Sequence, residues 1–179
     1  ISLEQAAAIA EAIGRPPPPI VLPEDVYEGE CDADGQRHGK GMWKGIYGSV
    51  YDGEWKAGLK EGKGKMKYAN GGVYSGEWKA GERDGTGTLR STGGDVYGGG
   101  WKAGLSHGKG KLTAASGEVD ICRYKAEKPY GVGVMWANNL RMAWRLKNGA
   151  KEDEISLERA ASIAAEIGIL PPQEPADFQ

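Results

Sequence analysis

The sequence predicts a mainly β protein: an elongated, twisted antiparallel ribbon of β-hairpin repeats with short flanking helices. Three observations support this fold class. The chain has 30 glycines in 179 residues, well above ordinary usage. Its six Trp and eight Tyr far outnumber the single Phe, and one motif recurs every 23 residues. Tyr and Trp carry a polar group that can stay in contact with water, which suits a thin sheet better than a deep globular core.

The repeated motif is clearest in three segments that align without gaps. They begin at Val50, Val73 and Val96, and each reads Val-Tyr-x-Gly-x-Trp-Lys-Ala-Gly. Each segment is followed by a Gly-x-Gly, at Gly62/Gly64, Gly85/Gly87 and Gly108/Gly110. A fixed internal period indicates an array in which each unit packs on its sequence neighbours.

Variant copies of the motif flank these three. The first copy has Tyr27 but carries Cys31 at the Trp position, and its first turn, residues 32–35, is one residue longer. The fifth copy has Cys122 at the middle Gly position and Tyr124 at the Trp position. We expect both thiols to be buried. Further along, four alternating apolar residues predict one strand of a degenerate sixth copy: Leu140, Met142, Trp144 and Leu146.

Each full copy predicts one hairpin. Strand alternation places Tyr51, Gly53 and Trp55 on one face and the charged residues between them on the other. A turn over residues 57–62 and a return strand over 63–68 complete the predicted unit. The glycines would leave flat patches on which aromatic rings can lie. The predicted repeat core is Tyr27, Tyr51, Trp55, Tyr74, Trp78, Tyr97, Trp101 and Tyr124.

The pattern Tyr-x-Gly-Glu-Trp-x-x-Gly-x-x-x-Gly-x-Gly at a 23-residue step resembles the MORN motif. The resemblance covers roughly residues 26–147. It implies a twisted antiparallel sheet with one hairpin per repeat. It also implies roles in cytoskeletal scaffolding, membrane-associated tethering and protein docking, and it allows an accessory module beside the kinase or methyltransferase domain of a larger enzyme.

The predicted organisation has five parts. These are a short helix over residues 1–15, a Pro-rich linker over 16–25, the repeat array over 26–149, a second helix over 155–168 and a Pro-containing tail over 169–179.

The two predicted helices resemble each other closely at an offset of 154 residues. Each has a Ser at the N-cap, an early Glu and a C-terminal Gly. Either the helices cover an end or a face of the ribbon, or they join successive arrays head to tail as parts of one unit in a longer tandem protein. The candidate assembly faces are two apolar stripes: Ala6, Ile9, Ala10 and Ile13 in the first helix, and Ala160, Ile163, Ala164 and Ile167 in the second.

Positive and negative residues are unevenly distributed along the chain, although its net charge is only −2. Residues 26–149 hold 20 Lys and Arg against 14 Asp and Glu, so the array is basic and its flanks are acidic. One repeat position predicts a row of lysines: Lys56, Lys79, Lys102 and Lys125. Such a row either contacts acidic phospholipids or belongs to an ordinary solvated face. Neither the charge balance nor the motifs favour nucleic acid as a partner.

The sequence contains no nucleophile–base set, phosphate-binding loop or dinucleotide fingerprint. We therefore expect no catalytic activity, no cofactor and no metal. Two cysteines without a disulfide framework favour a reducing cytoplasmic setting, and no apolar run is long enough to cross a bilayer. The resemblance to the MORN motif implies an association there with the cytoskeleton or a membrane. The leading hypothesis is a non-catalytic scaffold that docks other proteins or further copies of the same unit. Its alternatives are a tether for acidic membrane lipids and an accessory module of an enzyme.

Overall fold

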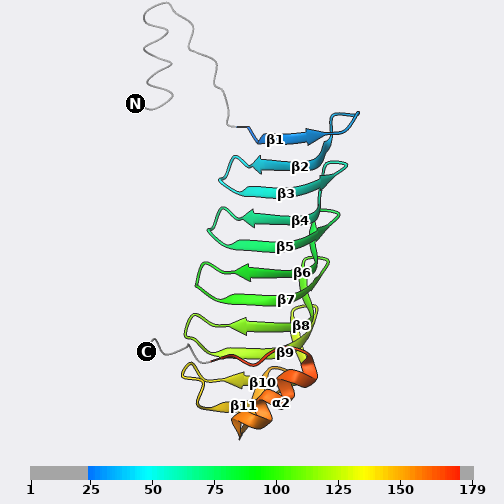
Figure 1. Ribbon diagram of the computed structural model, residues 1–179. Coiled ribbons are helices and arrows are strands. Elements are labelled where there is room, and N and C mark those ends of the chain that lie inside the picture. The colour runs from blue at the N-terminus through cyan, green and yellow to red at the C-terminus, as the bar shows by residue number, and fades with distance from the viewer. Residues whose placement is uncertain (1–23, 174–179) are drawn as a thin grey trace, which may run out of the picture.

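The computed structural model of the chain describes residues 24–173. They form one open sheet of 12 antiparallel strands in sequence order, with a helix at the C-terminal end (Figure 1). This confirms the predicted fold class. The strands are β1 Val26–Cys31, β2 Arg37–Lys44, β3 Val50–Lys56, β4 Leu59–Lys67, β5 Val73–Lys79, β6 Glu82–Arg90, β7 Val96–Lys102, β8 Leu105–Thr113, β9 Val119–Lys125, β10 Lys128–Trp136, β11 Ala143–Lys147 and β12 Ala150–Ile155, and the helix is α2 Leu157–Ile167.

Several predicted segments lie outside the described residues. They are the helix over 1–15 with its stripe Ala6, Ile9, Ala10 and Ile13, most of the linker over 16–25, and the tail from residue 174 onward.

The five hairpins from β3–β4 to β11–β12 each close through a two-residue turn that is tighter than the sequence predicted, whereas the β1–β2 hairpin has a longer turn over residues 32–36. Ala57 and Gly58 have φ values of 46° and 78°, as in the primed turns that match the twist of β-hairpins. Lys56 pairs with Leu59, so the return strand begins at once. The predicted turn over 57–62 was therefore wrong. Gly62, with φ 61°, lies inside β4 at a bulge, where a left-handed residue absorbs one extra position.

Each of the turns from β3–β4 to β9–β10 also bonds to the preceding hairpin, near the start of its return strand. The N–H of the second turn residue donates to a carbonyl one repeat earlier: Gly58 to Arg37 at 3.0 Å, Gly81 to Lys60 at 2.9 Å, Gly104 to Arg83 at 2.9 Å and Glu127 to Ser106 at 3.0 Å. Successive hairpins are thus joined at their turns as well as along their strands.

The sixth copy is a complete hairpin, shorter than the others. Leu140 has φ 60° and lies in the preceding turn, and β11 begins only at Ala143, so the predicted strand through Leu140 and Met142 was wrong at its start. Trp144 pairs with Met135, which places it at the Tyr position of the motif. Lys151 on β12 lies 3.2 Å above the ring of Trp144.

The sheet has an apolar cluster on each face. One face carries the Tyr and Trp rings along the whole ribbon. The opposite face has an apolar cluster only at the C-terminal end, where α2 packs across β9, β10 and β11 (Figure 1). The helix begins at the N-cap Ser156, whose hydroxyl accepts from the Arg159 N–H, and it ends at Gly168 in the left-handed region, with φ 82°.

Candidate docking surfaces

The predicted repeat core forms one chain of aromatic rings. Seven of its eight residues are buried, and Tyr27, on the edge strand β1, is half-buried. Consecutive rings meet edge to face at centroid distances between 5.0 and 5.5 Å, in the order Tyr27, Trp55, Tyr51, Trp78, Tyr74, Trp101, Tyr97, Tyr124. Edge-to-face pairs stabilise beyond the area they bury. This face is filled by the chain itself and is structural.

Glycines leave the space that the rings occupy. A Cβ on Gly53 would lie 2.5 Å from the Gly64 Cα and 2.6 Å from the Tyr51 hydroxyl. The polar atoms of the rings are satisfied in place, because the Tyr51 hydroxyl donates to the Glu54 carbonyl at 3.0 Å and the Trp55 Nε1 donates to the Gly41 carbonyl at 3.0 Å. The next two full repeats have the same pair of bonds.

A row of cations over the tryptophans was missed by the sequence reasoning. The Arg37 guanidinium lies 4.3 Å from the Trp55 ring, the Lys60 Nζ 4.6 Å from Trp78, and the Arg83 guanidinium 4.2 Å from Trp101. Burial, followed by the nearby charge of Arg37, lowers the pKa of Lys60. The signal was available, because residues 37, 60 and 83 are 23 positions apart.

The two cysteines differ in their surroundings. Cys31 is exposed, so the prediction that it is buried was wrong: β1 is an edge strand, and no described repeat lies beyond it. Cys122 is buried, and burial together with the charge of Asp120 raises its pKa to about 12.

The fifth repeat has a further departure that the sequence reasoning did not weigh. Asp120 stands at the Tyr position, 23 residues after Tyr97. Its Oδ1 is buried without a hydrogen-bond partner among the described residues, and burial, followed by the charge of Glu118, raises its pKa.

The predicted lysine row lies at the ends of β3, β5, β7 and β9, and all four side chains are exposed. Carboxylates lie among them. The Glu61 carboxylate accepts from the Ala80 N–H at 2.9 Å, and the Asp84 carboxylate accepts from the Ala103 N–H at 3.3 Å. A shallow pocket of about 580 Å³ beside Lys79 is also lined by Glu54, Glu61, Glu77 and Asp84. The row is therefore interleaved with negative charge rather than forming a continuous positive strip.

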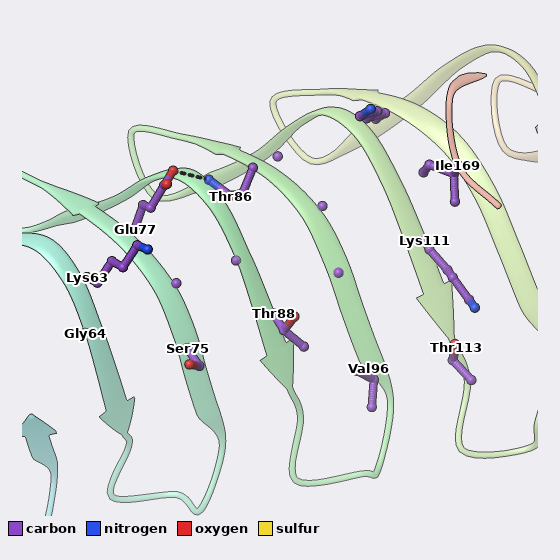
Figure 2. Close-up of a pocket in the computed structure, with 16 residues that line it drawn as sticks. Lys63, Gly64, Ser75, Glu77, Thr86, Thr88, Val96, Lys111, Thr113 and Ile169 are labelled. Atoms are coloured by element: carbon purple, nitrogen blue, oxygen red, sulfur yellow. Dashed lines mark hydrogen bonds between the residues drawn. The ribbon is translucent and has the colours of Figure 1, made fainter. Parts of the chain in front are cut away.

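The face opposite the rings contains a groove of about 1080 Å³ over β4 to β8 (Figure 2). Its middle is lined by small residues, including Ser75, Thr88 and Gly98, which are paired across β5, β6 and β7. Charged side chains also line it: Lys63, Glu77, Lys109 and Lys111. Ile169, just after α2, lines the end of the groove next to the helix.

One position of the motif changes chemistry along this face. It holds Glu30, Glu54 and Glu77 in the first three repeats, then Gly100 and finally Arg123. The Glu77 carboxylate accepts from the Thr86 N–H at 2.7 Å. In the fifth repeat, Arg123 Nη2 instead donates to the Glu166 carbonyl at 2.9 Å, at the C-terminal end of α2. The carboxylate has given way to a cation where the negative end of the helix dipole lies.

The C-terminal apolar stripe is covered by the chain itself. Ala160, Ile163, Ala164 and Ile167 are exposed by only 0, 2, 0 and 6% because they pack on the apolar patch of β9–β11. The expectation that this stripe is a free assembly face does not fit the described fold. The alternative, that the helix covers a face of the ribbon, agrees with it.

The geometry defines a class of protein: an open β-sheet of tandem hairpins. The regular hairpins each pack a Tyr and a Trp ring over glycines. The family model described as MORN repeat matches residues 33–45, 51–73, 74–96 and 97–119. The chain therefore contains MORN repeats at these four positions, as the sequence resemblance predicted.

Two other comparisons add little. No curated protein sequence matches the chain. Among solved structures, the chain is similar to the "SAS-4 (dCPAP) TCP domain in complex with a Proline Rich Motif of Ana2 (dSTIL) of Drosophila Melanogaster". That match has 13% identity, covers 79% of this chain and 95% of the other, and has a TM-score of 0.22, too low to indicate a shared overall arrangement.

Over residues 24–173, no helix combines the length and apolarity needed to span a bilayer. The same residues contain no cluster of three or more metal-ligating side chains.

Proposed function

We propose that the chain is a non-catalytic scaffold that docks other proteins, or further copies of itself, on the face of the ribbon opposite the aromatic rings. The groove over β4–β8 is the observation that carries this proposal. The ring face is filled along its whole length, whereas the opposite face is covered only where α2 lies. A hollow lined by small side chains allows the backbone of a partner segment to approach the sheet closely.

The charges at the groove suggest the chemistry of its partner. Lys63, Lys109 and Lys111 stand against one carboxylate, Glu77, whose oxygen already accepts the Thr86 N–H. Lys109 Nζ also donates to the Gly168 carbonyl at 3.1 Å, which holds this cation at the helix end of the groove. The groove therefore favours an acidic segment over a basic one, through electrostatic complementarity.

Selection from a displayed library of random peptides tests this proposal. We expect the selected peptides to be rich in Asp and Glu and to bind at least about tenfold more weakly to Thr88→Glu and Gly98→Glu variants, which fill the groove and repel acidic peptides, a loss equivalent to about 1.4 kcal/mol. A Cβ on Gly98 would meet only the Thr88 hydroxyl, at 3.7 Å, so that substitution fills the groove without straining the sheet. Thr92→Glu, in an exposed turn, is the matched control and should leave binding unchanged. Peptides that bind all three variants equally well would contradict docking in the groove.

The exposed lysine row supports a second candidate, a tether for acidic lipids. Because carboxylates interleave the row, we expect only weak and salt-sensitive sedimentation with phosphatidylserine vesicles. Replacing Lys56, Lys79 and Lys102 with Glu should abolish that sedimentation. Tight binding of the unmodified chain at physiological salt, lost in the triple variant, would place the lipid role first.

A further inference from the structure

The apolar patch on β9–β11 contacts only a few side chains of α2. Four side chains of the helix are buried against the sheet: Ala160, Ile163, Ala164 and Ile167. The polar contacts from the sheet reach only backbone atoms of the helix. Arg123 donates to the Glu166 carbonyl and Lys109 donates to the Gly168 carbonyl. Any segment that forms a helix and carries this stripe presents the same contact surface.

Residues 1–14 carry the same stripe. They match residues 155–168 at ten of 14 positions, including the N-cap Ser, the C-terminal Gly and all four buried side chains. The four positions that differ are Arg159, Ser162, Ala165 and Glu166, which are Gln5, Ala8, Glu11 and Ala12 in the N-terminal segment. All four are exposed on α2. The differences are confined to exposed side chains of the helix, and the sheet contacts only the backbone carbonyl of Glu166 among these four residues.

The match ends where the helix ends. Ile169 packs on the edge of the apolar cluster, and its counterpart is Arg15. The shared contact surface is therefore the helix itself and does not include the segment that follows it.

We propose that residues 1–14 of a second copy of this chain bind the patch on β9–β11 that α2 covers, taking the place of α2. This contact rests on the assembly part of the proposed function and does not involve the groove. A second copy is favoured because the patch lies eight strands from β1, which is about 38 Å at the usual strand spacing. The 11 residues from 15 to 25 span at most about 36–40 Å when fully extended, so a chain could reach its own patch only if the linker were almost straight.

The resident helix controls this exchange. Only Ser156 separates β12 from α2, so the effective concentration of α2 at the patch is very high. At low protein concentration each chain covers its own patch and remains a monomer. Release of α2 opens the patch to residues 1–14 of another copy, and the result is a swapped assembly.

A four-residue exchange tests whether the N-terminal sequence fits the patch. The variant R159Q/S162A/A165E/E166A gives α2 the sequence of residues 1–14 within the intact chain. Its melting temperature should stay within about 2 °C of the unmodified protein, because all four changes are at exposed positions. A larger loss would overturn the proposal. Ile163→Asp, which places a charge on the buried stripe, is the control and should lower the melting temperature well beyond that margin.

Released patches test the exchange between copies. In the full chain, Ala160→Glu with Ala164→Glu should undock α2, and light scattering should then show a mass rising with concentration to about twice that of the monomer or more. Adding Ile9→Asp should restore the monomer. A released chain that stays monomeric with its sheet intact, or one that assembles regardless of Ile9→Asp, would overturn the proposal. If the released variant does not fold, the four-residue exchange decides alone. The groove variant Thr88→Glu should change neither result, which separates this proposal from docking in the groove.

Discussion

The second to fourth repeats and the last two hairpins share one fold but use their two faces differently. In both regions, strand pairing and the ring face follow the motif, from Tyr51 to Tyr124. Apart from Val50, Val73 and Val96, the opposite face is mostly polar or small along β3–β8, and it is apolar along β9–β11, where α2 covers it. The middle of the ribbon is therefore stabilised from one face, and its C-terminal end from both.

The difference arises at positions that the motif leaves free. The residue after the Tyr position is Asp52, Ser75 and Gly98 in the three regular repeats and Ile121 in the fifth. On the return strand, Lys65, Thr88 and Lys111 give way to Val134. Motif residues thus specify the ribbon, whereas the free positions decide whether its other face stays open or receives a helix.

The largest expected effect comes from breaking the ring chain in the middle of the ribbon. Trp78 contacts both Tyr51 and Tyr74, and Trp78→Ala should lower the free energy of unfolding by about 3–5 kcal/mol, as for other buried large aromatics. Lys79→Ala, one residue along on the opposite and exposed face, should change it by less than about 0.5 kcal/mol. Denaturant melts measure both. Equal losses would show that the two faces do not differ as described.

Alkaline pH should weaken every region that contains the ring chain. Burial raises the pKa of Tyr74 and of Tyr97 to about 12 each. An unfolded Tyr ionises near pH 10, so the folded state holds more protons than the unfolded state between pH 10 and 12. Stability is therefore complete below pH 10 and falls above it, by up to about 1.4 kcal/mol per pH unit for each such residue. Melting temperatures between pH 8 and 12 measure this. A flat profile above pH 10 would contradict burial of the hydroxyls.

Asp120 is expected to destabilise the C-terminal end, although that end is packed on both faces of the sheet. Asp120→Asn removes a charge whose buried Oδ1 has no partner among the described residues, so it should stabilise the chain by about 1 kcal/mol at pH 7. The gain should shrink as the pH falls, because the raised pKa leaves Asp120 neutral in acid. Chemical denaturation at pH 7 and pH 4 measures the gain in free energy of unfolding. A gain that is larger at pH 4 than at pH 7 would contradict a destabilising charge on Asp120.

The smallest expected effect concerns the tight turns. Ala80 has φ 50°, a left-handed conformation that alanine adopts at a cost, whereas the sixth hairpin has Asn148 in the same conformation with φ 52°. Ala80→Asn should stabilise the chain by about 0.5–1 kcal/mol, and Asn148→Ala should destabilise it by a similar amount. Thermal melts of the two variants form a matched pair. Shifts of the same sign would contradict the turn geometry.

The sequence was sufficient to predict the regular part of the molecule, because Tyr51, Gly53 and Trp55 recur at a fixed step and each has one physical role. It did not reveal the short turn, because Ala57 is a poor choice for a left-handed residue and Gly62 read more naturally as part of a loop. Cys31 was misplaced because a motif position indicates burial only when neighbouring strands supply the cover. Asp120 and Ile121 were passed over because a motif search weighs the residues that match. The place of α2 depends on those unmatched positions, so the motif could not predict it.

Hydrogen exchange read by mass spectrometry tests the central claim, that the ribbon is stabilised from one face in its middle and from two at its C-terminal end. In the unmodified chain, amides of β9–β11 should exchange more slowly than those of β3–β5. Ile163→Asp should speed exchange in β9–β11 while β3–β5 keep their protection, because each hairpin packs on its neighbours and α2 contacts only the C-terminal strands. Exchange that speeds up equally along the whole sheet, or that stays unchanged in β9–β11, would contradict the account.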